Sequence, residues 1–320
     1  MKAILVGLGA AGFGWYKRLR DRGLLAAVAE PNIAMKAKMG NDPFPFYTSL
    51  AEALEQESAD FVVNVTPPGA HSAVNHAAFD RKLPVLCEKP ISFDYGESVD
   101  IVARAAKENI PFMIAENYRR FPHMRKMKQL LEQGAIGDVS FIDIRFYRYH
   151  RVERNYTVQM LDDIGVHHFD LLRYLTGREG EAVQARLFNP PGGWREEGAV
   201  LSAQAIVEME GGIAAGYSAS IAARGPETPW SGDWRIEGTE GAIELIGQSI
   251  RLTAGGRTEP VDDFAGVDAS DALSEFVASL REKREAETSG RDYLKTQALV
   301  HFAKLSAESG GRTRVTLPRL

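Results

Sequence analysis

Short apolar runs alternate with amphipathic segments through the first third of the chain. The apolar runs are predicted to form strands at residues 3–6, 24–29, 61–65, 84–87 and 112–115. The amphipathic segments are predicted to form helices at residues 10–22, 49–57, 72–81 and 94–109. Strands that alternate with helices pair in parallel, so this pattern predicts an α/β domain with a doubly wound parallel sheet.

The pattern changes after about Tyr118. Strands are expected at residues 139–149, 182–188, 201–209, 213–220, 234–237, 242–245, 250–253 and 314–317. Helices are expected at residues 123–133, 163–175, 270–283 and 292–308. This part predicts an α+β domain with a large, mostly antiparallel open sheet. We therefore expect two domains, residues 1–118 and residues 119–320, with C-terminal helices that can pack back on the first.

Bulk composition narrows the class of protein. The chain has 320 residues, 44% of them hydrophobic and 25% charged, which is typical of a globular protein. Its net charge of -5 gives no reason to expect nucleic acid or an anionic membrane as a partner. Cys87 is the only cysteine, and no apolar run approaches the roughly 20 residues of a membrane-spanning helix. We expect a cytoplasmic protein without a disulfide.

A glycine-rich turn, GLGAAG, follows the first predicted strand and opens the first predicted helix. In a dinucleotide-binding turn Gly7 permits the tight bend, Gly9 lets the backbone approach the pyrophosphate, and Gly12 lets the helix pack on the strand. The N–H groups at the helix start, at Ala10 and Ala11, favour phosphate. A glycine-rich turn without a ligand is the alternative, but the strand–turn–helix setting favours a Rossmann-type dinucleotide site.

Glu30 ends the second predicted strand, near the spacing of about 20 residues expected for ribose recognition. A carboxylate there accepts hydrogen bonds from both ribose hydroxyls and repels a 2′-phosphate. Pro31 and Asn32 follow it, rather than an arginine. The sequence therefore predicts NAD as the cofactor in preference to NADP. The alternative for Glu30 is a solvated charge at a strand end.

Three further motifs carry polar residues: TPPGAH at residues 66–71, CEKP at 87–90 and DIGVH at 163–167. The first two follow predicted strands, and a doubly wound sheet binds its ligands at the carboxyl ends of its strands. The third opens a predicted helix of the second domain. We therefore expect the first two motifs to lie beside the cofactor.

With these motifs the chain resembles the Gfo/Idh/MocA family, the group related to glucose-fructose oxidoreductase and inositol dehydrogenase. The resemblance covers nearly the full length. It also includes NYRRFP at residues 117–122, GAIG at 134–137, DIGVHHFD at 163–170 and IEGTEG at 236–241. It implies an NAD-dependent oxidoreductase that transfers a hydride between nicotinamide and a secondary hydroxyl or ketone of a sugar, polyol or inositol-like substrate.

By this resemblance Lys89, Asp163 and His167 match the family's catalytic residues, and the chemistry agrees. A histidine is suited to accept a hydroxyl proton near neutral pH, and a lysine ammonium stabilises the oxygen that becomes charged. Asp163 lies four residues before His167, so on one helix their side chains share a face and the carboxylate orients the imidazole. The alternatives are that Lys89 is a surface charge, Asp163 a helix cap and His167 a buried structural histidine. The presence of all three residues together disfavours these alternatives.

Further contacts are expected around these residues. The resemblance implies that His71 and Asn117 line the nicotinamide side of the cleft and that Glu88 lies near the nicotinamide ribose. The cofactor set is completed by Thr66, Pro67 and Lys89. The expected substrate contacts are Lys89, Arg119, Tyr149, Asp163 and His167. The alternative for Arg119 is a solvated side chain. The sequence does not decide which of residues 145–162 contact the substrate, because residues 155–162 (NYTVQMLD) replace a glycine-rich run of many relatives.

Two other functions are compatible with the same cofactor motif. One is an NAD-assisted glycosidase of the same family, which would use the same residues. Another is a non-catalytic dinucleotide-binding regulator, which would have lost Lys89 or His167, and this chain keeps both. A metal site from Asp163, His167 and His168 is disfavoured because adjacent residues do not share a helix face, so no metal is predicted and His168 is interpreted as structural.

A homodimer or homotetramer is also expected. An antiparallel sheet packs one face on its helices, and its other face needs a cover where it carries apolar residues. Val207, Ile213 and Tyr217 are candidates for that face. Assembly through this sheet is common among the relatives.

Overall fold

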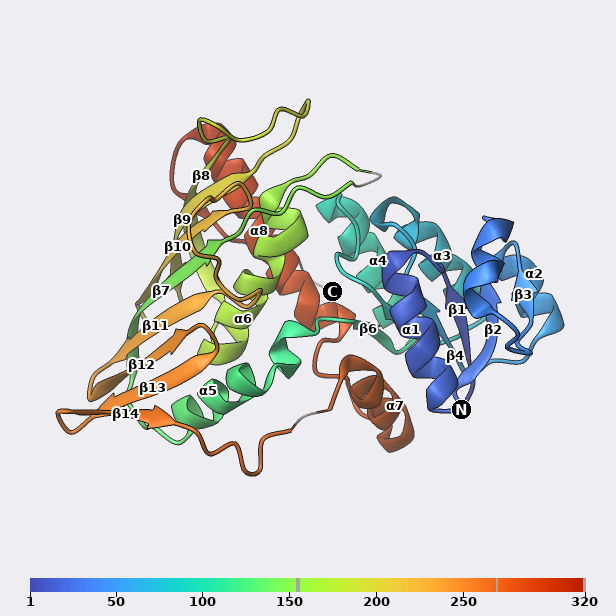
Figure 1. Cartoon of the computed structure of the whole chain (residues 1–320), viewed down its shortest axis with the longest axis horizontal. Helices are drawn as coiled ribbons and strands as arrows, with labels where there is room; N and C mark the ends of the chain where they lie inside the picture. Colours follow the sequence, from blue (N-terminus) through green and yellow to red (C-terminus); the bar gives the residue numbers. More distant parts are fainter. Residues whose placement is uncertain (154–155, 269, 319–320) are drawn as a thin grey trace. The chain divides into compact units, whose positions relative to one another are not determined.

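The computed structural model describes residues 1–153, 156–268 and 270–318. The chain divides into two compact units. The first unit is formed mainly by Met1–Glu116 and Ala272–Leu294, and the second by Asn117–Asp271 and Lys295–Leu317. Figure 1 labels their helices and strands. Among the described residues, no helix is long and apolar enough to cross a membrane.

A six-stranded parallel sheet forms the centre of the first unit. Its strand order is β3 (Phe46–Tyr47), β2 (Leu25–Ala29), β1 (Ala3–Val6), β4 (Phe61–Asn64), β5 (Val85–Cys87) and β6 (Phe112–Ile114). The helices are α1 (Ala10–Asp21), η1 (Ile33–Met39), α2 (Leu50–Gln56), α3 (Pro68–Asp80), α4 (Tyr95–Lys107) and α7 (Ala272–Glu282). This confirms the predicted doubly wound sheet and adds β3 and η1.

The central strands of this sheet are buried along their whole length. Every residue of β1, β4, β5 and β6 is buried, as expected for parallel strands with helices on both faces. The strands therefore offer no side chain to a ligand. The turns that follow their carboxyl ends are the places where polar groups can reach one.

Helix α7 completes the core of the first unit although it lies far along the chain. Its Phe276 packs edge to face against Phe61 of β4, with ring centroids 5.6 Å apart. Leu273 and Val277 belong to the same buried cluster as Leu5 of β1. Burial of each large apolar side chain contributes roughly 1.5–3 kcal/mol, so α7 is an integral part of this unit.

A nine-stranded sheet forms the second unit. Its strand order is β14 (Arg257–Val261), β13 (Ser249–Ala254), β12 (Gly241–Ile246), β11 (Asp233–Gly238), β7 (Val139–Tyr147), β10 (Ile213–Ser220), β9 (Ser202–Met209), β8 (Gly180–Phe188) and β15 (Thr313–Arg314). Only β7 and β10 pair in parallel among these strands. The helices are η2 (Tyr118–Arg120), α5 (Pro122–Glu132), η3 (Leu161–Gly165), α6 (Val166–Thr176) and most of α8 (Gly290–Ser309). The predicted α+β class is confirmed.

One face of this sheet packs on the helices of the same unit. The hydroxyl of Tyr217 in β10 lies 2.9 Å from Nδ1 of His168 in α6, and its ring packs against Phe169. Val207 and Ile213 are buried as well. The prediction that Val207, Ile213 and Tyr217 line an uncovered face is therefore wrong, because strand alternation places them on the helix-covered face.

The opposite face of the sheet is mixed in character. Phe141 of β7 is 46% exposed and Ile206 of β9 is 57% exposed. Ile206 pairs with Gly216 of β10, and Gln204 is its neighbour along β9 on the same face. This face therefore exposes Phe141 and Ile206, and not the three residues that the sequence analysis named as candidates for it.

Candidate functional site

The turn between β1 and α1 requires glycine at two positions. Gly7 has a φ of +97°, and a Cβ placed on it would lie 2.6 Å from the carbonyl oxygen of Val65. A Cβ on Gly12 would collide with the carbonyl group of Gly7, so only glycine lets α1 approach the turn this closely. A Cβ on Gly9 would meet no atom within 4 Å, so the backbone at Gly9 faces open space.

The start of α1 is suited to an anion. Gly9 precedes the helix without a side-chain cap, and the first turn contains no acidic residue. Ala10 and Ala11, which begin the helix, are both exposed. The N–H groups and dipole of such a helix start attract phosphate. These features fit the pyrophosphate of a dinucleotide.

Two charged side chains hold this turn. Glu30 accepts a hydrogen bond of 2.8 Å from the N–H of Leu8 through Oε2, and one of 2.9 Å from the N–H of Asn32 through Oε1. Nζ of Lys38 donates to the carbonyl oxygens of Leu8 and Gly9 at 3.0 and 3.3 Å. Sequence reasoning missed Lys38, because only the 3₁₀ helix η1 brings it back to the turn.

The turn after β4 is organised by Asn64, the last residue of that strand. Its Oδ1 accepts hydrogen bonds from the hydroxyl of Thr66 at 2.7 Å and from the N–H of Thr66 at 3.3 Å. Its amide nitrogen donates to the carbonyl oxygen of His71 at 3.1 Å. Pro67 directly precedes α3, which begins earlier than predicted because the following proline suits a first helical position.

His71 connects this turn to the turn after β5. Its Nδ1 lies 2.7 Å from the carbonyl oxygen of Pro90, and its Nε2 lies 2.9 Å from that of Thr66. Burial lowers the pKa of His71, while the two carbonyl contacts act in the opposite direction. Since both ring nitrogens face main-chain carbonyls, the imidazole fixes the two turns to each other.

Glu88 and Lys89 form the turn after β5. The carboxylate of Glu88 accepts a hydrogen bond of 2.8 Å from the indole N–H of Trp15 in α1, and a longer one of 3.3 Å from the N–H of Lys89. The side chain of Lys89 is half-buried. Trp15, which sequence reasoning also missed, thus ties the CEKP turn to the helix of the glycine turn. The cofactor candidates of the first unit are brought together.

In the second unit the DIGVH motif adopts a π-helical turn, η3, before α6 begins at Val166. Such turns occur frequently at functional sites. Asp163 is buried in η3, and its Oδ1 accepts a hydrogen bond of 2.9 Å from the hydroxyl of Tyr156. The wider turn changes the angle between Asp163 and His167 from that of the regular helix assumed in the sequence analysis. Asn155, at the start of the segment that departs from the relatives, lies outside the described residues.

His167 is packed against an aromatic ring. It is 6% exposed, and its imidazole stacks on the phenol ring of Tyr118 with centroids 3.9 Å apart and an interplanar angle of 11°. Tyr118 belongs to the NYRRFP motif, whose sequence does not tell which side chain faces α6. Lys89 belongs to the first unit, whereas Asp163 and His167 belong to the second.

His168 has a different, structural environment. It is fully buried, with Nδ1 2.9 Å from the hydroxyl of Tyr217 and Nε2 2.9 Å from the carbonyl oxygen of Trp230. Within the described ranges, no group of three or more His, Cys, Asp or Glu side chains is arranged to hold a metal ion.

The remaining predicted contact residues lie in varied surroundings. Arg119 forms a buried, bidentate ion pair with Asp170, with N–O distances of 2.6 and 2.7 Å. Asn117 directly precedes η2 and is half-buried. Tyr149 is 41% exposed, and its ring packs edge to face on Trp194 at 5.8 Å. Roles for Arg119, Asn117 and Tyr149 in binding stay predictions, and for Arg119 binding would compete with the ion pair.

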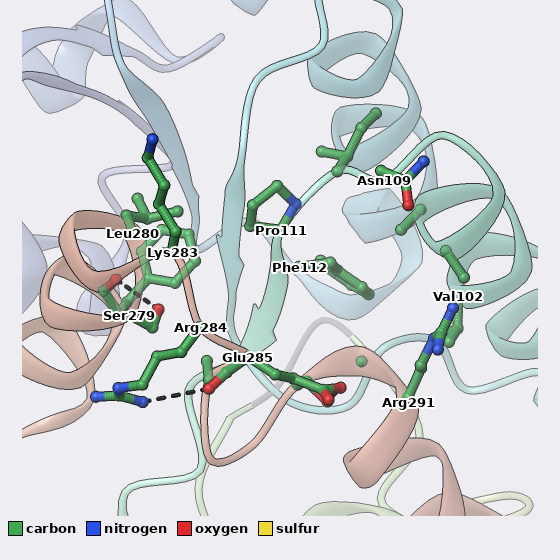
Figure 2. A pocket seen from close by; sticks show the side chains of 17 residues that line it. Val102, Asn109, Pro111, Phe112, Ser279, Leu280, Lys283, Arg284, Glu285 and Arg291 are labelled. Carbon is green, nitrogen blue, oxygen red and sulfur yellow. Dashed lines mark hydrogen bonds between the residues drawn. The ribbon is translucent and has the colours of Figure 1, made fainter.

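A pocket of about 520 Å³ lies elsewhere in the first unit. Figure 2 shows Phe112 between Lys283 and Arg291, which come from opposite sides. Phe112 is the first residue of β6, so the pocket lies at the amino end of that strand. The glycine, TPPGAH and CEKP turns follow the carboxyl ends of strands, and this pocket is therefore not part of the cofactor site.

Comparison with family models matches both parts of the chain. Residues 1–116 match an oxidoreductase family with an NAD-binding Rossmann fold, and residues 124–244 match the GFO/IDH/MocA C-terminal domain. The two matches together span most of the chain, including the glycine, TPPGAH, CEKP and DIGVH motifs, whereas Asn117 and Arg119 lie between them.

The individual relatives share less than a third of their residues with this chain over the matched parts. An inositol 2-dehydrogenase of Corynebacterium glutamicum is 29% identical over 216 residues, which are 65% of this chain and 64% of the relative. The match thus spans less than two thirds of that relative. A D-apiose dehydrogenase of Paraburkholderia graminis is 28% identical over 293 residues, 82% of this chain and 75% of the relative. The crystal structure of an oxidoreductase from Agrobacterium radiobacter, in complex with NAD+, L-tartaric acid and magnesium, has a TM-score of 0.89 at 23% identity over 98% of both chains.

Proposed function

Because this chain belongs to the GFO/IDH/MocA family of NAD-binding oxidoreductases, we propose that it is a dehydrogenase acting on a secondary hydroxyl or on the matching ketone. The predicted family and its NAD cofactor are confirmed. The proposed substrate is a sugar, polyol or inositol, in keeping with the names of the inositol 2-dehydrogenase and D-apiose dehydrogenase relatives. The observation that carries the proposal is the glycine turn, open at Gly9 and anchored by Glu30.

The first unit contributes the groups that hold NAD. The open backbone at Gly9 and the start of α1 would receive the pyrophosphate, and the carboxylate of Glu30 would accept the ribose hydroxyls. The TPPGAH and CEKP turns, which His71 fixes to each other, would border the nicotinamide half. When bound, NAD supplies the hydride acceptor for an alcohol, and its reduced form supplies the donor for a ketone. Because Glu30 repels a 2′-phosphate, NAD is preferred over NADP.

His167 is the proposed general base. An imidazole accepts a hydroxyl proton near neutral pH, and burial of His167 limits exchange of that proton with bulk water. Asp163, which accepts a hydrogen bond from the hydroxyl of Tyr156, is the proposed partner that orients the imidazole. The proton thus moves from the substrate oxygen to the ring of His167.

Lys89 is the proposed electrostatic stabiliser of the same substrate oxygen. Its ammonium group lowers the energy of the developing alkoxide during oxidation and polarises the carbonyl during reduction. Lys89 belongs to the first unit and His167 to the second.

The proposal is tested with a panel of inositols, aldoses, sugar acids and simple glycosides. We expect at least one inositol or sugar to produce NADH when it is mixed with enzyme and NAD. Cleavage of a glycoside with no net NADH would identify an NAD-assisted glycosidase instead. Absence of NAD binding by calorimetry would reject both.

We also propose an assembly and a location for the protein. A homodimer or homotetramer would cover the exposed Phe141 and Ile206 of the sheet, and a monomeric mass by light scattering would reject it.

A cytoplasmic location fits a chain whose lone Cys87 is buried, because secreted domains commonly rely on disulfides. Cell fractionation tests the location.

A further inference from the structure

Tyr118 is part of a run of packed aromatic rings in the second unit. The Tyr118 ring stacks on the imidazole of His167, with centroids 3.9 Å apart and an interplanar angle of 11°. The ring of Phe121 also packs against the Tyr118 ring, with centroids 4.9 Å apart and an interplanar angle of 30°. Phe121 in turn lies 5.4 Å from His123. Two nearly parallel rings at 3.9 Å are in van der Waals contact, so the imidazole cannot tilt toward Tyr118 without a clash.

The groups nearest to this stack have partners of their own. His168 contacts Tyr217 and Trp230, and Arg119 pairs with Asp170. A smaller side chain at position 118 would therefore leave both sets of contacts in place. It would change chiefly the surface that supports the imidazole.

We propose that Tyr118 is a positioning residue that holds the His167 imidazole in the orientation required for proton transfer. The catalytic part of this inference rests on the proposed role of His167 as general base, whereas the structural part does not. Tyr118 is also the next residue after Asn117, so one short segment joins the predicted nicotinamide contact to the support of the proposed base.

The structural part is tested by NMR of histidine-labelled protein. The ring current of a stacked phenol shifts the Hε1 signal of His167 upfield, and the signal is assigned by its loss in His167→Gln. We expect Tyr118→Leu to abolish the upfield shift and Tyr118→Phe to keep it. Tyr174→Leu removes another aromatic ring from α6, the helix that carries His167, and should leave the upfield shift unchanged. An unchanged His167 signal in Tyr118→Leu would overturn the proposal.

The catalytic part is tested by steady-state kinetics. We expect Tyr118→Leu to lower kcat by about 10- to 100-fold, because small misplacements of a reacting group carry costs of that order, and Tyr118→Phe to restore most of it. The dissociation constant of NAD should be unchanged. If Tyr118→Leu loses the NMR shift but keeps kcat, positioning for catalysis is wrong. If His167→Ala itself keeps turnover, the proposed function has failed and the structural result stands.

A second inference comes from Lys38, which contacts the glycine turn from η1. In a trans peptide the C=O and the next N–H point in opposite directions. Since Nζ of Lys38 bonds the carbonyl oxygens of Leu8 and Gly9, the N–H groups of Gly9 and Ala10 point away from the lysine. The structure assigns Lys38 as a positioning residue that aims these two N–H groups toward the pyrophosphate of the dinucleotide.

Calorimetry with NAD and NADP tests this assignment. Lys38→Met should weaken both cofactors alike by about 3- to 10-fold, because a charged hydrogen bond at an exposed site is lost. The matched control Lys36→Met, an exposed lysine on the same helix η1, should have no effect. A loss confined to NADP would mean that Lys38 binds a 2′-phosphate instead, and no loss for either cofactor would also overturn the assignment.

Discussion

The candidate residues of the two units are held in place by different kinds of contact. In the first unit most of the contacts that hold the candidate residues are made with main-chain groups. His71 lies between the carbonyl oxygens of Thr66 and Pro90, and Glu30 accepts hydrogen bonds from the N–H groups of Leu8 and Asn32. These partners remain whatever side chains the neighbouring positions carry.

In the second unit side chains hold one another. His167 stacks on Tyr118, Asp163 accepts from Tyr156, and Arg119 pairs with a carboxylate 51 residues along the chain. Each of these contacts is removed by one substitution. On the cofactor side most partners are main-chain groups, although Trp15 and Glu88 form a side-chain pair. The substrate side depends on a few side-chain pairs and is therefore easier to alter.

Among the changes that test this difference between the units, the largest loss of stability is expected at Asp170. Asp170→Asn should lower the free energy of unfolding by about 3–5 kcal/mol, because it leaves the Arg119 guanidinium buried without its charged partner. Urea denaturation checks the value. Glu208→Gln, which removes the exposed pair with Arg312, is the matched control and should change stability little. A loss at Asp170 as small as that of the control would mean that the buried ion pair contributes little to stability.

The first unit should respond most strongly at Gly12. Gly12→Ala should weaken NAD binding by about 5- to 150-fold, since its Cβ forces the turn and α1 apart at a cost of about 1–3 kcal/mol. Gly14→Ala in the same helix is the control, because a Cβ there meets no atom within 4 Å. Calorimetry with NAD compares them, and equal affinities would contradict a turn shaped by its backbone.

A side-chain change on the cofactor side should have a smaller effect. Glu30→Ser should weaken NAD binding by about 10-fold and reduce the preference for NAD over NADP, because the charged acceptor for the ribose hydroxyls is lost. Glu55→Gln, at an exposed position of α2, should leave both affinities as they are. If NADP already binds the unmodified protein as tightly as NAD, the role given to Glu30 is wrong.

A further effect concerns the pH dependence of stability. Burial lowers the pKa of His123 to about 4, against about 6.5 in an unfolded chain. Because the unfolded state binds this proton first, stability should be complete above about pH 6.5 and fall as the pH drops toward 4, by about 1–3 kcal/mol. Urea denaturation at several pH values should give a flatter profile for His123→Gln. An unchanged profile would mean that other groups control acid stability.

The elements and turns that the sequence predicted well are those with local signals. Gly7 and Gly12 stand where backbone geometry excludes other residues, and the buried strands of the first unit are apolar runs, such as β4 with its β-branched Val62 and Val63. No comparable signal exists for Lys38 or Tyr118, since their partners lie on other elements. Strand β14 carries mostly exposed residues and so has no apolar pattern to detect.

The sheet face was predicted wrongly for a related reason. Ile206 and Val207 are adjacent apolar residues on β9, and a one-residue shift exchanges the two faces of a strand. The sequence pattern alone cannot decide which of them packs on the helices. The contact of Tyr217 with His168 settles it in favour of Val207, and only the tertiary structure contains that contact.

The most direct test of the account measures turnover and NAD affinity together for His167→Ala, once a substrate is found. The account predicts that turnover falls by about 10²- to 10⁴-fold, because a positioned proton acceptor is removed. The dissociation constant of NAD should not change, since Gly9 and Glu30 are untouched. Near-normal turnover would contradict the role of His167 as general base. A parallel loss of NAD binding would show instead that the residue is structural.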